Sequence, residues 1–167
     1  MEYWDIYDKN KQRTGRQMKR NDWILQDDEY HLTALGVVCR PDGKFLITRR
    51  AADKHWGPGM WEVPGGGVLA GEDSLAAAVR EVEEETGLAV SGSDAEHLLT
   101  YRRENPGTGD NYIVDVYRFV LDFNEAEVRL QREEADGFRL ADAEEIRALA
   151  QQGMFLHYDS IKEAFEG

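Results

Sequence analysis

The segment at residues 66–88, "GGVLAGEDSLAAAVREVEEETGL", restricts the possible folds more than any other part of the chain. A glycine-rich stretch leads into helical spacing, with Asp73 or Ser74 as the expected N-cap and Gly87 just past the helix end. The expected apolar face consists of Leu75, Ala78, Val79, Val82 and Thr86. We therefore expect a loop and an amphipathic helix that packs on a core by one side.

The end of this helix carries four glutamates within five residues. Because successive helical residues are about 100° apart, Glu81, Glu84 and Glu85 share one side, while Glu83 points toward solvent. Both the like charges one turn apart and the C-terminal end of the helix dipole disfavour this arrangement. Carboxylate oxygens are ligands that Mg²⁺ and Mn²⁺ prefer. The stripe therefore predicts a Mg²⁺ or Mn²⁺ site, and the alternative is a solvated acidic face.

Bound cations would allow this segment to catalyse a reaction. They would attract a diphosphate into an acidic protein and activate a water molecule as nucleophile. Glu81 or a nearby acid could act as general base. Arg80 could neutralise and orient the cluster, for instance by pairing with Glu84 four residues later.

Length and charge limit the other classes of function. The chain has 167 residues, which suits one domain, and its formal net charge of −13 argues against broad nucleic-acid binding. A single cysteine, Cys39, rules out an intramolecular disulfide. We see no signal peptide and no apolar run of the roughly 20 residues that a membrane span needs. These features predict a cytoplasmic protein with no membrane association.

The rest of the chain predicts a mixed sheet with helices packed on it. The opening residues 3–8 and the turn after them predict a hairpin, followed by a connector to residue 30. Arg13, Arg16, Lys19 and Arg20 lie close together in this part, either as an anion or partner site or as a solvated loop. We expect strands at 31–39, 45–50, 60–64, 96–104, 111–123 and 137–140, and further helices at 141–153 and 157–167. The predicted division is a hairpin and connector at 1–30, a core at 31–150 and a C-terminal helix at 151–167, all in one domain.

Nine positions of the 66–88 segment fit the signature G-x5-E-x7-R-E-U-x-E-E-x-G-U, where U is a bulky aliphatic residue. They are Gly66, Glu72, Arg80, Glu81, Val82, Glu84, Glu85, Gly87 and Leu88. The segment therefore resembles the Nudix box. The resemblance implies an α/β/α sandwich with a mixed β-sheet and a catalytic loop-helix-loop at 66–88. It also implies Mg²⁺- or Mn²⁺-dependent attack of water on a nucleoside diphosphate-linked or other organic diphosphate.

The resemblance also implies roles for individual residues. Glu81, Glu84 and Glu85 would be metal ligands, joined by the carbonyl of Gly65. Glu72 and Arg80 would hold the loop and the helix together. In some members an acid beyond the box is the base, and the candidates here are Glu133 and Glu134. The choice of base among these two and Glu81 stays open, and the expected catalytic set is Arg80, Glu81, Glu84 and Glu134.

The flanks of the box are similar to a branch related to isopentenyl diphosphate isomerase. That enzyme shares the Nudix fold and carries a catalytic cysteine in the strand before the box. This chain has "EVPGGGV" there, and Cys39 lies in a different strand. The complete box therefore favours a hydrolase over an isomerase. It also disfavours a non-catalytic ligand sensor, which would tolerate the loss of box carboxylates.

Several residues outside the box are candidates for substrate binding. Arg49, Arg50, Lys54 and His55 form a basic patch that either meets substrate phosphates or extends from strand ends into solvent. Trp56 and Trp61 could stack on a base or cover an isoprenoid-like tail, and the alternative for Trp61 is packing in the core. Tyr112 is a further candidate for the same cleft. His31 is either a metal ligand or a structural histidine. We expect a small-molecule diphosphate as partner and a monomer or a homodimer.

Overall fold

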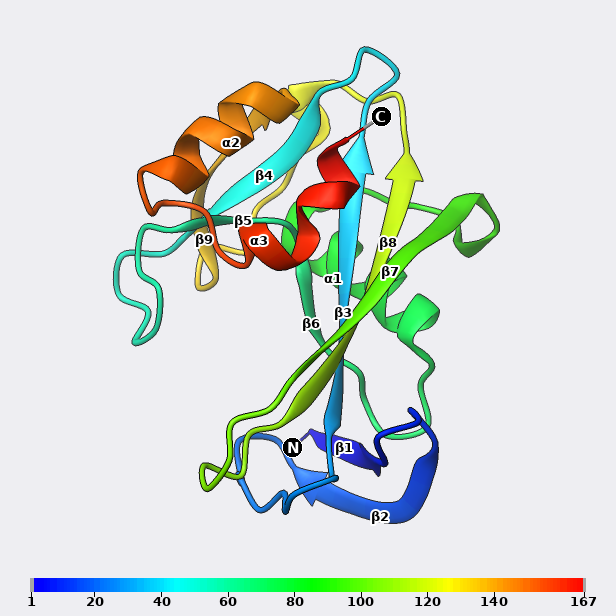
Figure 1. Ribbon diagram of the computed structural model, residues 1–167. Coiled ribbons are helices and arrows are strands. Elements are labelled where there is room, and N and C mark those ends of the chain that lie inside the picture. The colour runs from blue at the N-terminus through cyan, green and yellow to red at the C-terminus, as the bar shows by residue number, and fades with distance from the viewer. Residues whose placement is uncertain (1, 167) are drawn as a thin grey trace.

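A mixed seven-stranded sheet forms the centre of the computed structural model, which describes residues 2–166 (Figure 1). Its order is β5-β4-β3-β8-β7, with β6 paired to β3 and β9 paired to β4. β3 and β8 are parallel, and the other pairs are antiparallel. The strands are β3 (His31–Cys39), β4 (Phe45–Arg50), β5 (Trp61–Glu62), β6 (Gly65–Gly67), β7 (Ala95–Arg103), β8 (Tyr112–Val120) and β9 (Ala135–Ala141).

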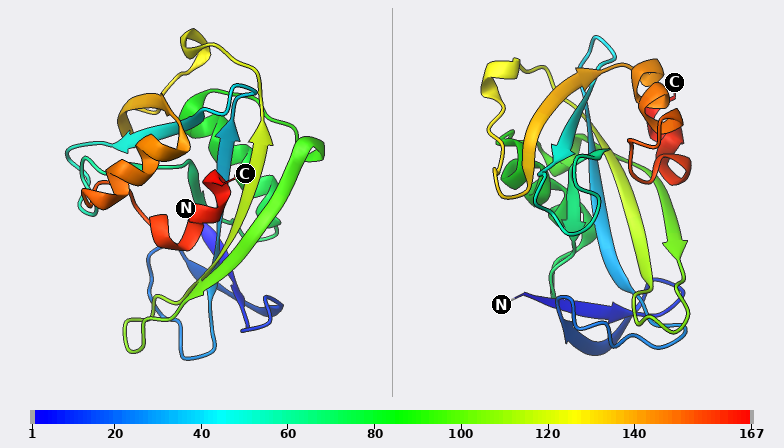
Figure 2. Two further views of the ribbon diagram at one scale, coloured as in Figure 1. Left: turned by 45° about the horizontal axis from the view of Figure 1, so that its top comes forward. Right: turned by 90° about the vertical axis from the view of Figure 1, so that its left-hand side faces the viewer.

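Helices cover both faces of this sheet. α1 (Ser74–Thr86) lies on one face, and α2 (Ala143–Gln151), α3 (Tyr158–Ile161) and a 3₁₀ turn at Lys162–Phe165 lie on the other (Figure 2). Further 3₁₀ turns are Gly92–Asp94 and Glu125–Glu127. Along β3, Ala34 and Val38 pack toward α1, whereas Leu35 and Val37 pack toward the C-terminal helices. The expected α/β/α sandwich is confirmed.

The α1 helix begins and ends where its sequence predicts. The carboxylate of Asp73 accepts a hydrogen bond from the Ala76 amide at 2.7 Å, and Gly87 ends the helix with φ of 76°. Its buried residues are Ser74, Ala77, Ala78, Val82 and Thr86. Leu75 and Val79 are half-buried at the edge of the core, so the apolar stripe is centred closer to Ala77 than expected.

The N-terminal hairpin forms a separate two-stranded sheet at the base of the molecule (Figure 1). It consists of β1 (Tyr3–Tyr7) and β2 (Arg13–Lys19). The hairpin was expected, but β2 extends through residues that the sequence assigns to the connector. It has its own small core of Trp4, Ile6, Met18 and Leu25, against which Leu69 packs.

Two other segments differ from expectation. The glycine stretch before the box contains the short strand β6, because its backbone pairs with β3. The C-terminal helix expected at 157–167 is a short α3 continued by a 3₁₀ turn, and residue 167 lies outside the described residues. Within residues 2–166, none of the helices has the length and apolar composition needed to cross a membrane.

Candidate active site

Strand β6 places three glycines beside the last turns of α1. Gly66 pairs with Ala34 and Gly65 with Leu35. A Cβ on Gly66 would lie 2.5 Å from Oε1 of Glu81, so this carboxylate can take its position only against a glycine. The amide of Gly65 donates to Oε2 of Glu85 at 2.7 Å. The glycine strand and two glutamates of the stripe are therefore in direct contact.

Arg80 connects the loop before the helix to the glutamate stripe. Its guanidinium donates two hydrogen bonds to Glu72, at 2.8 and 2.9 Å. It also donates to Glu81 at 2.8 Å, to Glu84 at 3.3 Å and to the carbonyl of Gly67 at 3.2 Å. These bonds raise the pKa of Arg80. Every donor group of this guanidinium is occupied, so its function in this conformation is to hold the loop, helix and strand together.

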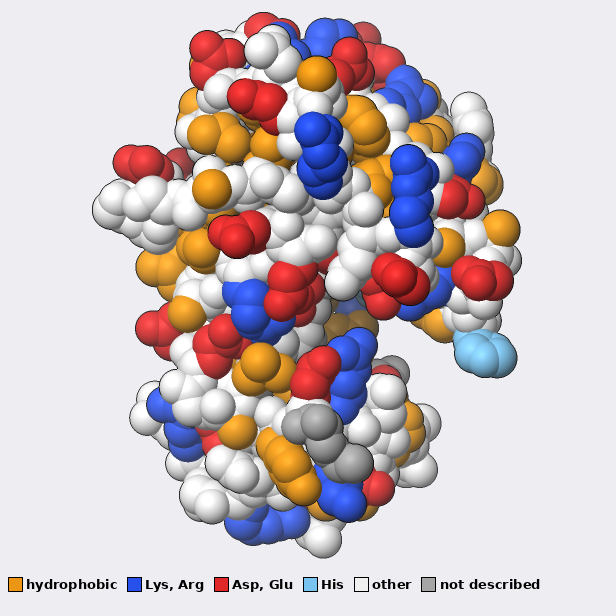
Figure 3. All heavy atoms as spheres, turned by 180° about the vertical axis from the view of Figure 1, so that it is seen from behind, with side chains coloured by type: hydrophobic (Ala, Val, Ile, Leu, Met, Phe, Trp, Pro, Cys, Tyr) orange, Lys and Arg blue, Asp and Glu red, His pale blue; other side chains and the backbone are white. Residues whose placement is uncertain are grey.

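A cavity of about 260 Å³ lies over this arrangement, and we call it the glutamate cavity. Seen from behind, acidic and basic side chains gather around a recess between the N-terminal hairpin and the rest of the molecule (Figure 3). The cavity brings together all six residues predicted as catalytic or metal-binding. Its lining is Glu2, Arg20, Gly65, Gly66, Gly67, Leu69, Arg80, Glu81, Glu84, Glu85, Gln131 and Glu134.

The two candidates for a base beyond the box differ in position. Glu134 lines the glutamate cavity and accepts a hydrogen bond from Nζ of Lys54 at 2.7 Å. Glu133, its neighbour in the chain, is exposed and does not belong to that lining. The structure therefore places Glu134, and not Glu133, where it can reach a group bound among the glutamates.

Negative charge accumulates in the cavity without full compensation. Burial, with repulsion from Glu81, Glu62 and Glu134, raises the pKa of Glu85 well above its usual value. Burial also raises the pKa of Glu81, although the charges of Arg80 and Arg20 act in the opposite direction. Partly buried carboxylates that repel one another are stabilised by a bound cation.

The donor groups of the cavity fit a hard divalent cation. Carboxylates and a backbone carbonyl are the ligand types that Mg²⁺ and Mn²⁺ prefer, and the repulsion around Glu85 is what such an ion offsets. Among the described residues, no three acidic, histidine or cysteine side chains already converge as a metal-binding group. Arg80 holds Glu81 and Glu84 in their present positions.

Glu62 belongs to this electrostatic cluster, although sequence reasoning missed it. It lies on β5, where burial raises its pKa against the opposing charge of Arg50, which donates to it at 3.3 Å. Its own charge contributes to the raised pKa of Glu85. The available signal was a single acid between Trp61 and Val63, in a short apolar strand just before the glycines.

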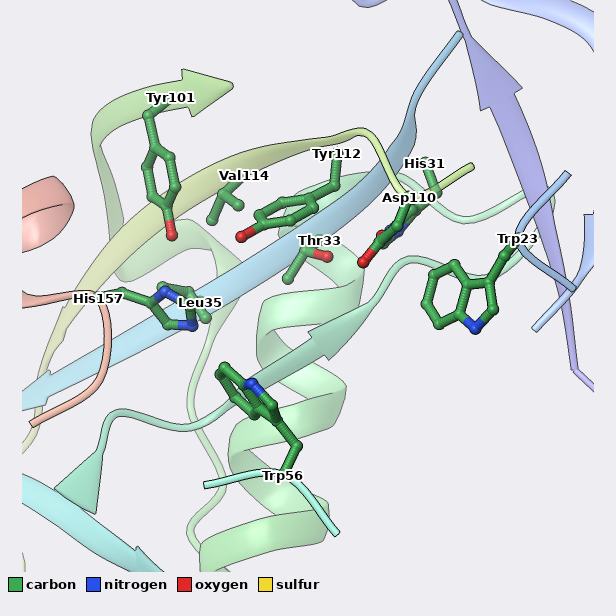
Figure 4. A pocket seen from close by; sticks show the side chains of 10 residues that line it. All are labelled: Trp23, His31, Thr33, Leu35, Trp56, Tyr101, Asp110, Tyr112, Val114 and His157. Atoms are coloured by element: carbon green, nitrogen blue, oxygen red, sulfur yellow. The ribbon is translucent and has the colours of Figure 1, made fainter. Parts of the chain in front are cut away.

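A second and larger cavity, of about 460 Å³, lies on the other face of the sheet from α1, and we call it the aromatic pocket. Its lining is Trp23, His31, Thr33, Leu35, Trp56, Tyr101, Asp110, Tyr112, Val114 and His157. The rings of Trp56 and His157 lie 5.8 Å apart at 26°, and those of His31 and Tyr112 lie 5.6 Å apart. Figure 4 shows the hydroxyls of Tyr101 and Tyr112 pointing into the pocket. Such a lining suits a planar or apolar group with a polar edge.

A smaller cavity of about 130 Å³ lies between the two. It shares Thr33, Leu35 and His157 with the aromatic pocket. It shares Gly65 and Gly66 with the glutamate cavity. The small cavity therefore has lining residues in common with each of the other two, and it lies next to both.

The predicted substrate-binding residues separate into two groups. Trp56 and Tyr112 line the aromatic pocket, whereas Arg49 and Arg50 line none of these three cavities. Arg49 donates to Asp136 at 2.7 Å. Arg50 donates to the carbonyl of Trp56 at 2.9 Å and lies over its ring, so it supports a pocket residue without entering the pocket.

His31 and Cys39 lie at opposite ends of β3. His31 stacks on Trp4 at 4.4 Å and contacts Asp110 through Nε2 at 3.0 Å, which places it in the wall of the aromatic pocket. Cys39 is four residues beyond Leu35, about 13 Å along the strand from the position that pairs with Gly65. Burial raises the pKa of its thiol. The cysteine is therefore remote from the glycines and poorly suited to act as a thiolate.

Comparison with known proteins places this site in a family. The NUDIX domain model matches residues 29–163. A Nudix hydrolase of Listeria monocytogenes is 32% identical over 167 residues, covering 99% of this chain and 94% of the relative. An RNA pyrophosphohydrolase of Caulobacter vibrioides is 30% identical over 160 residues, covering 84% and 89%. A crystal structure of a Deinococcus radiodurans protein superimposes with a TM-score of 0.77 at 19% identity, covering 99% of this chain and 100% of that one. The chain therefore belongs to the Nudix family and is a Nudix hydrolase.

Proposed function

We propose that this hydrolase cleaves a diphosphate linkage in a nucleoside diphosphate-linked or other organic diphosphate, with Mg²⁺ or Mn²⁺ as cofactor. One observation carries the proposal. The small cavity that shares Gly65 and Gly66 with the glutamate cavity also shares Thr33, Leu35 and His157 with the aromatic pocket. A diphosphate at the glutamates would place its organic part among the aromatic side chains.

The glutamate cavity supplies the groups that the reaction needs. Glu81, Glu84 and Glu85 would hold the cation together with the carbonyl of Gly65. When bound, the cation supplies charge neutralisation and Lewis acidity at the diphosphate. Arg80 orients the glutamates through its bonds to Glu81 and Glu84.

Glu134 is the general base that this arrangement supports best. It lines the cavity, and Lys54 holds its carboxylate at 2.7 Å. Both Glu81 and Glu134 accept a bond from a cationic side chain, but Glu81 is also an expected ligand of the cation, whereas Glu134 is not. We therefore assign proton removal from the attacking water to Glu134, as a role that kinetics can test.

The aromatic pocket is the proposed binding site for the organic part of the substrate. Trp56 is 57% exposed, and a ligand could stack on its ring in place of His157, with which it stacks in this structure. Tyr112 contributes a second ring and a hydroxyl. The relative named as an RNA pyrophosphohydrolase makes a triphosphorylated RNA a necessary comparison, although the net charge of −13 opposes a long polyanion.

The test is hydrolysis of a panel of diphosphates with Mg²⁺, with Mn²⁺ and after chelation. The panel comprises nucleoside triphosphates, dinucleotides, nucleotide sugars, isopentenyl diphosphate and a 5′-triphosphorylated RNA. We expect metal-dependent cleavage of one class, lost in Glu84→Gln and Glu85→Gln. Isomerisation of isopentenyl diphosphate without hydrolysis of any compound would contradict the proposal.

A further inference from the structure

The N-terminal hairpin is attached to the loop that leads into α1. The carbonyl of Tyr3 accepts from the Ala70 amide at 2.8 Å, and the carboxylate of Asp5 accepts from the Gly71 amide at 2.8 Å. Arg13 donates to the carbonyl of Glu72 at 3.1 Å. Three consecutive residues of the loop are therefore bonded to the hairpin, which fixes its position relative to the glutamate cavity.

Trp4 provides a further contact at the glycine strand. A Cβ on Gly67 would lie 2.7 Å from Nε1 of Trp4, so the indole packs directly on the backbone of β6. Trp4 is buried and also stacks on His31. The hairpin thus contacts both the glycine strand and a wall residue of the aromatic pocket, although it precedes the residues that match the family model.

Arg20 is the cation that this hairpin brings to the glutamate cavity. It follows β2 directly, and its amide donates to the carbonyl of Glu2 at 3.0 Å. Its guanidinium contacts both carboxylate oxygens of Glu2 at 3.1 Å. The side chains are 53% and 46% exposed, and exposed pairs of this kind contribute little to stability. A phosphate can therefore replace Glu2 as the partner of Arg20.

Arg20 differs from Arg80, the other guanidinium of the cavity lining, in its bonding partners. The described lining contains five carboxylates and two guanidiniums, and Arg80 is already bonded to Glu72, Glu81 and Glu84. Arg20 is the second guanidinium, and it lines the same cavity as Glu81, Glu84 and Glu85. Of the two guanidiniums in the described lining, Arg20 is therefore the one that is not bonded to glutamates of the 66–88 segment. An incoming diphosphate would meet this guanidinium.

The same segment reaches the aromatic pocket. Trp23, three residues after Arg20, lines that pocket and lies 6.2 Å from Trp4 in an edge-to-face arrangement. Figure 4 shows its ring at the end of the pocket nearest β1. Residues 20–23 therefore contribute to the cavities at both ends of the proposed substrate path.

We propose that Arg20 binds a phosphate oxygen of the substrate and that the N-terminal hairpin is a substrate-binding element of this hydrolase. The proposal rests on the proposed function in one respect: the diphosphate is taken to lie in the glutamate cavity. A guanidinium donates paired hydrogen bonds that suit phosphate, and a lysine at the same position would preserve only the charge.

Arg20→Met tests the proposal, with Arg16→Met as a matched control. Arg16 lies on the same hairpin, is also 53% exposed and also pairs with a glutamate, Glu29, but it does not belong to the cavity lining. The probe is methylenediphosphonate with Mg²⁺, and its affinity is measured by isothermal titration calorimetry. We expect about tenfold weaker binding in Arg20→Met, partial recovery in Arg20→Lys and a change of less than about twofold in Arg16→Met. Thermal unfolding of each variant verifies that it is folded.

The outcomes separate this proposal from the function on which it rests. If a diphosphate is hydrolysed but Arg20→Met and Arg16→Met have the same affinity and KM as the wild type, the role of Arg20 is wrong and the hydrolase stands. If the analogue binds through Arg20 but no compound of the panel is hydrolysed, the reaction is wrong and the binding role stands. Failure of the wild-type chain to bind the analogue would overturn the role of Arg20.

Discussion

Glu85 is the residue at which folding and proposed function are most opposed. Burial and repulsion from Glu81, Glu62 and Glu134 raise its pKa, so its ionised form destabilises the folded state near neutral pH. The Gly65 amide at 2.7 Å offsets only part of this cost. A residue retained against stability is a good candidate for a metal ligand.

Glu85→Gln should therefore separate stability from activity. The amide oxygen can still accept from Gly65, and the repulsion with the neighbouring carboxylates is removed. We expect Tm of the metal-free protein to rise, while kcat falls by about 100-fold or more because a ligand of the cation is lost. Calorimetry in EDTA and hydrolysis assays in Mg²⁺ measure the two effects. A lower Tm together with full activity would show that Glu85 is structural.

Asp115 has the opposite relation to stability. Burial alone would raise its pKa, but hydrogen bonds from Ser74, Thr100 and Lys11 outweigh burial and hold the pKa below its usual value. Nζ of Lys11 lies 3.0 Å from its carboxylate and connects the hairpin turn to β8. A depressed pKa stabilises the fold at pH values above the unfolded pKa, and this contribution is lost as the pH falls through the folded pKa.

We expect Asp115→Asn to lower the free energy of unfolding at pH 7 by about 1–3 kcal/mol. As the pH falls below about 4 the difference from wild type should shrink, because the carboxyl of the unfolded wild-type chain becomes protonated first and that of the folded chain follows at its lower pKa. Urea unfolding at pH 7 and pH 3 measures both values. An equal difference at the two pH values would mean that the Asp115 charge is not what stabilises the fold.

At the scale of elements, strand β6 determines how closely the glutamates approach the sheet. Gly66→Ala would place a Cβ 2.5 Å from Glu81 and displace its carboxylate. Gly92→Ala is the matched control, because its Cβ would meet Leu75 at an ordinary 3.5 Å. We expect at least about a tenfold loss of kcat in Gly66→Ala and less than about twofold in Gly92→Ala. Similar kcat values in both variants would mean that the contact does not position Glu81.

The elements also explain which parts of the structure could be predicted from the sequence. β3 and β4 have the expected bounds because β3 is a long, mostly apolar run, β4 begins with three apolar residues, and turn residues separate the two strands. β2 was missed in part because most of it is exposed, with Met18 as its buried residue, so it shows no apolar alternation. The glutamate stripe was readable because its members belong to one helix of known geometry.

The other members of the site come together only through tertiary contacts. Arg20, Glu62 and His157 lie on three segments that are distant in sequence, and no local spacing relates them. Arg49 was a candidate to meet phosphates or to extend into solvent, and nothing in the sequence indicated that the pairing of Arg49 with Gly137 brings Asp136 next to it. The sequence therefore identified the glutamates of α1 by their spacing, and Gly65, Glu134, Trp56 and Tyr112 as separate candidates, but it could not relate these residues in space.

On the scale of the whole molecule, the chemistry and the recognition of the organic group occupy different structural parts. Glu81, Glu84 and Glu85 belong to α1, whereas the aromatic pocket is built from β3, β7, β8 and four loop segments on the opposite face of the sheet (Figures 2 and 4). Gly65 and Gly66 line both the glutamate cavity and the small cavity next to the aromatic pocket. Substitutions among the glutamates should therefore change kcat, whereas substitutions in the aromatic pocket should change KM.

Trp56→Ala tests this separation, with Val120→Ala as control. Trp56 is 57% exposed and Val120 is 58% exposed, but only Trp56 belongs to the aromatic pocket. We expect KM for the hydrolysed diphosphate to rise about 5- to 100-fold in Trp56→Ala, since stacking on an aromatic ring contributes about 1–3 kcal/mol per base. The rise in Tm that Mg²⁺ produces should remain, because the cation binds at the other part of the site. Loss of this rise in Tm in Trp56→Ala would show that the two parts are not independent. An equal rise of KM in Val120→Ala would show that the pocket does not select the substrate.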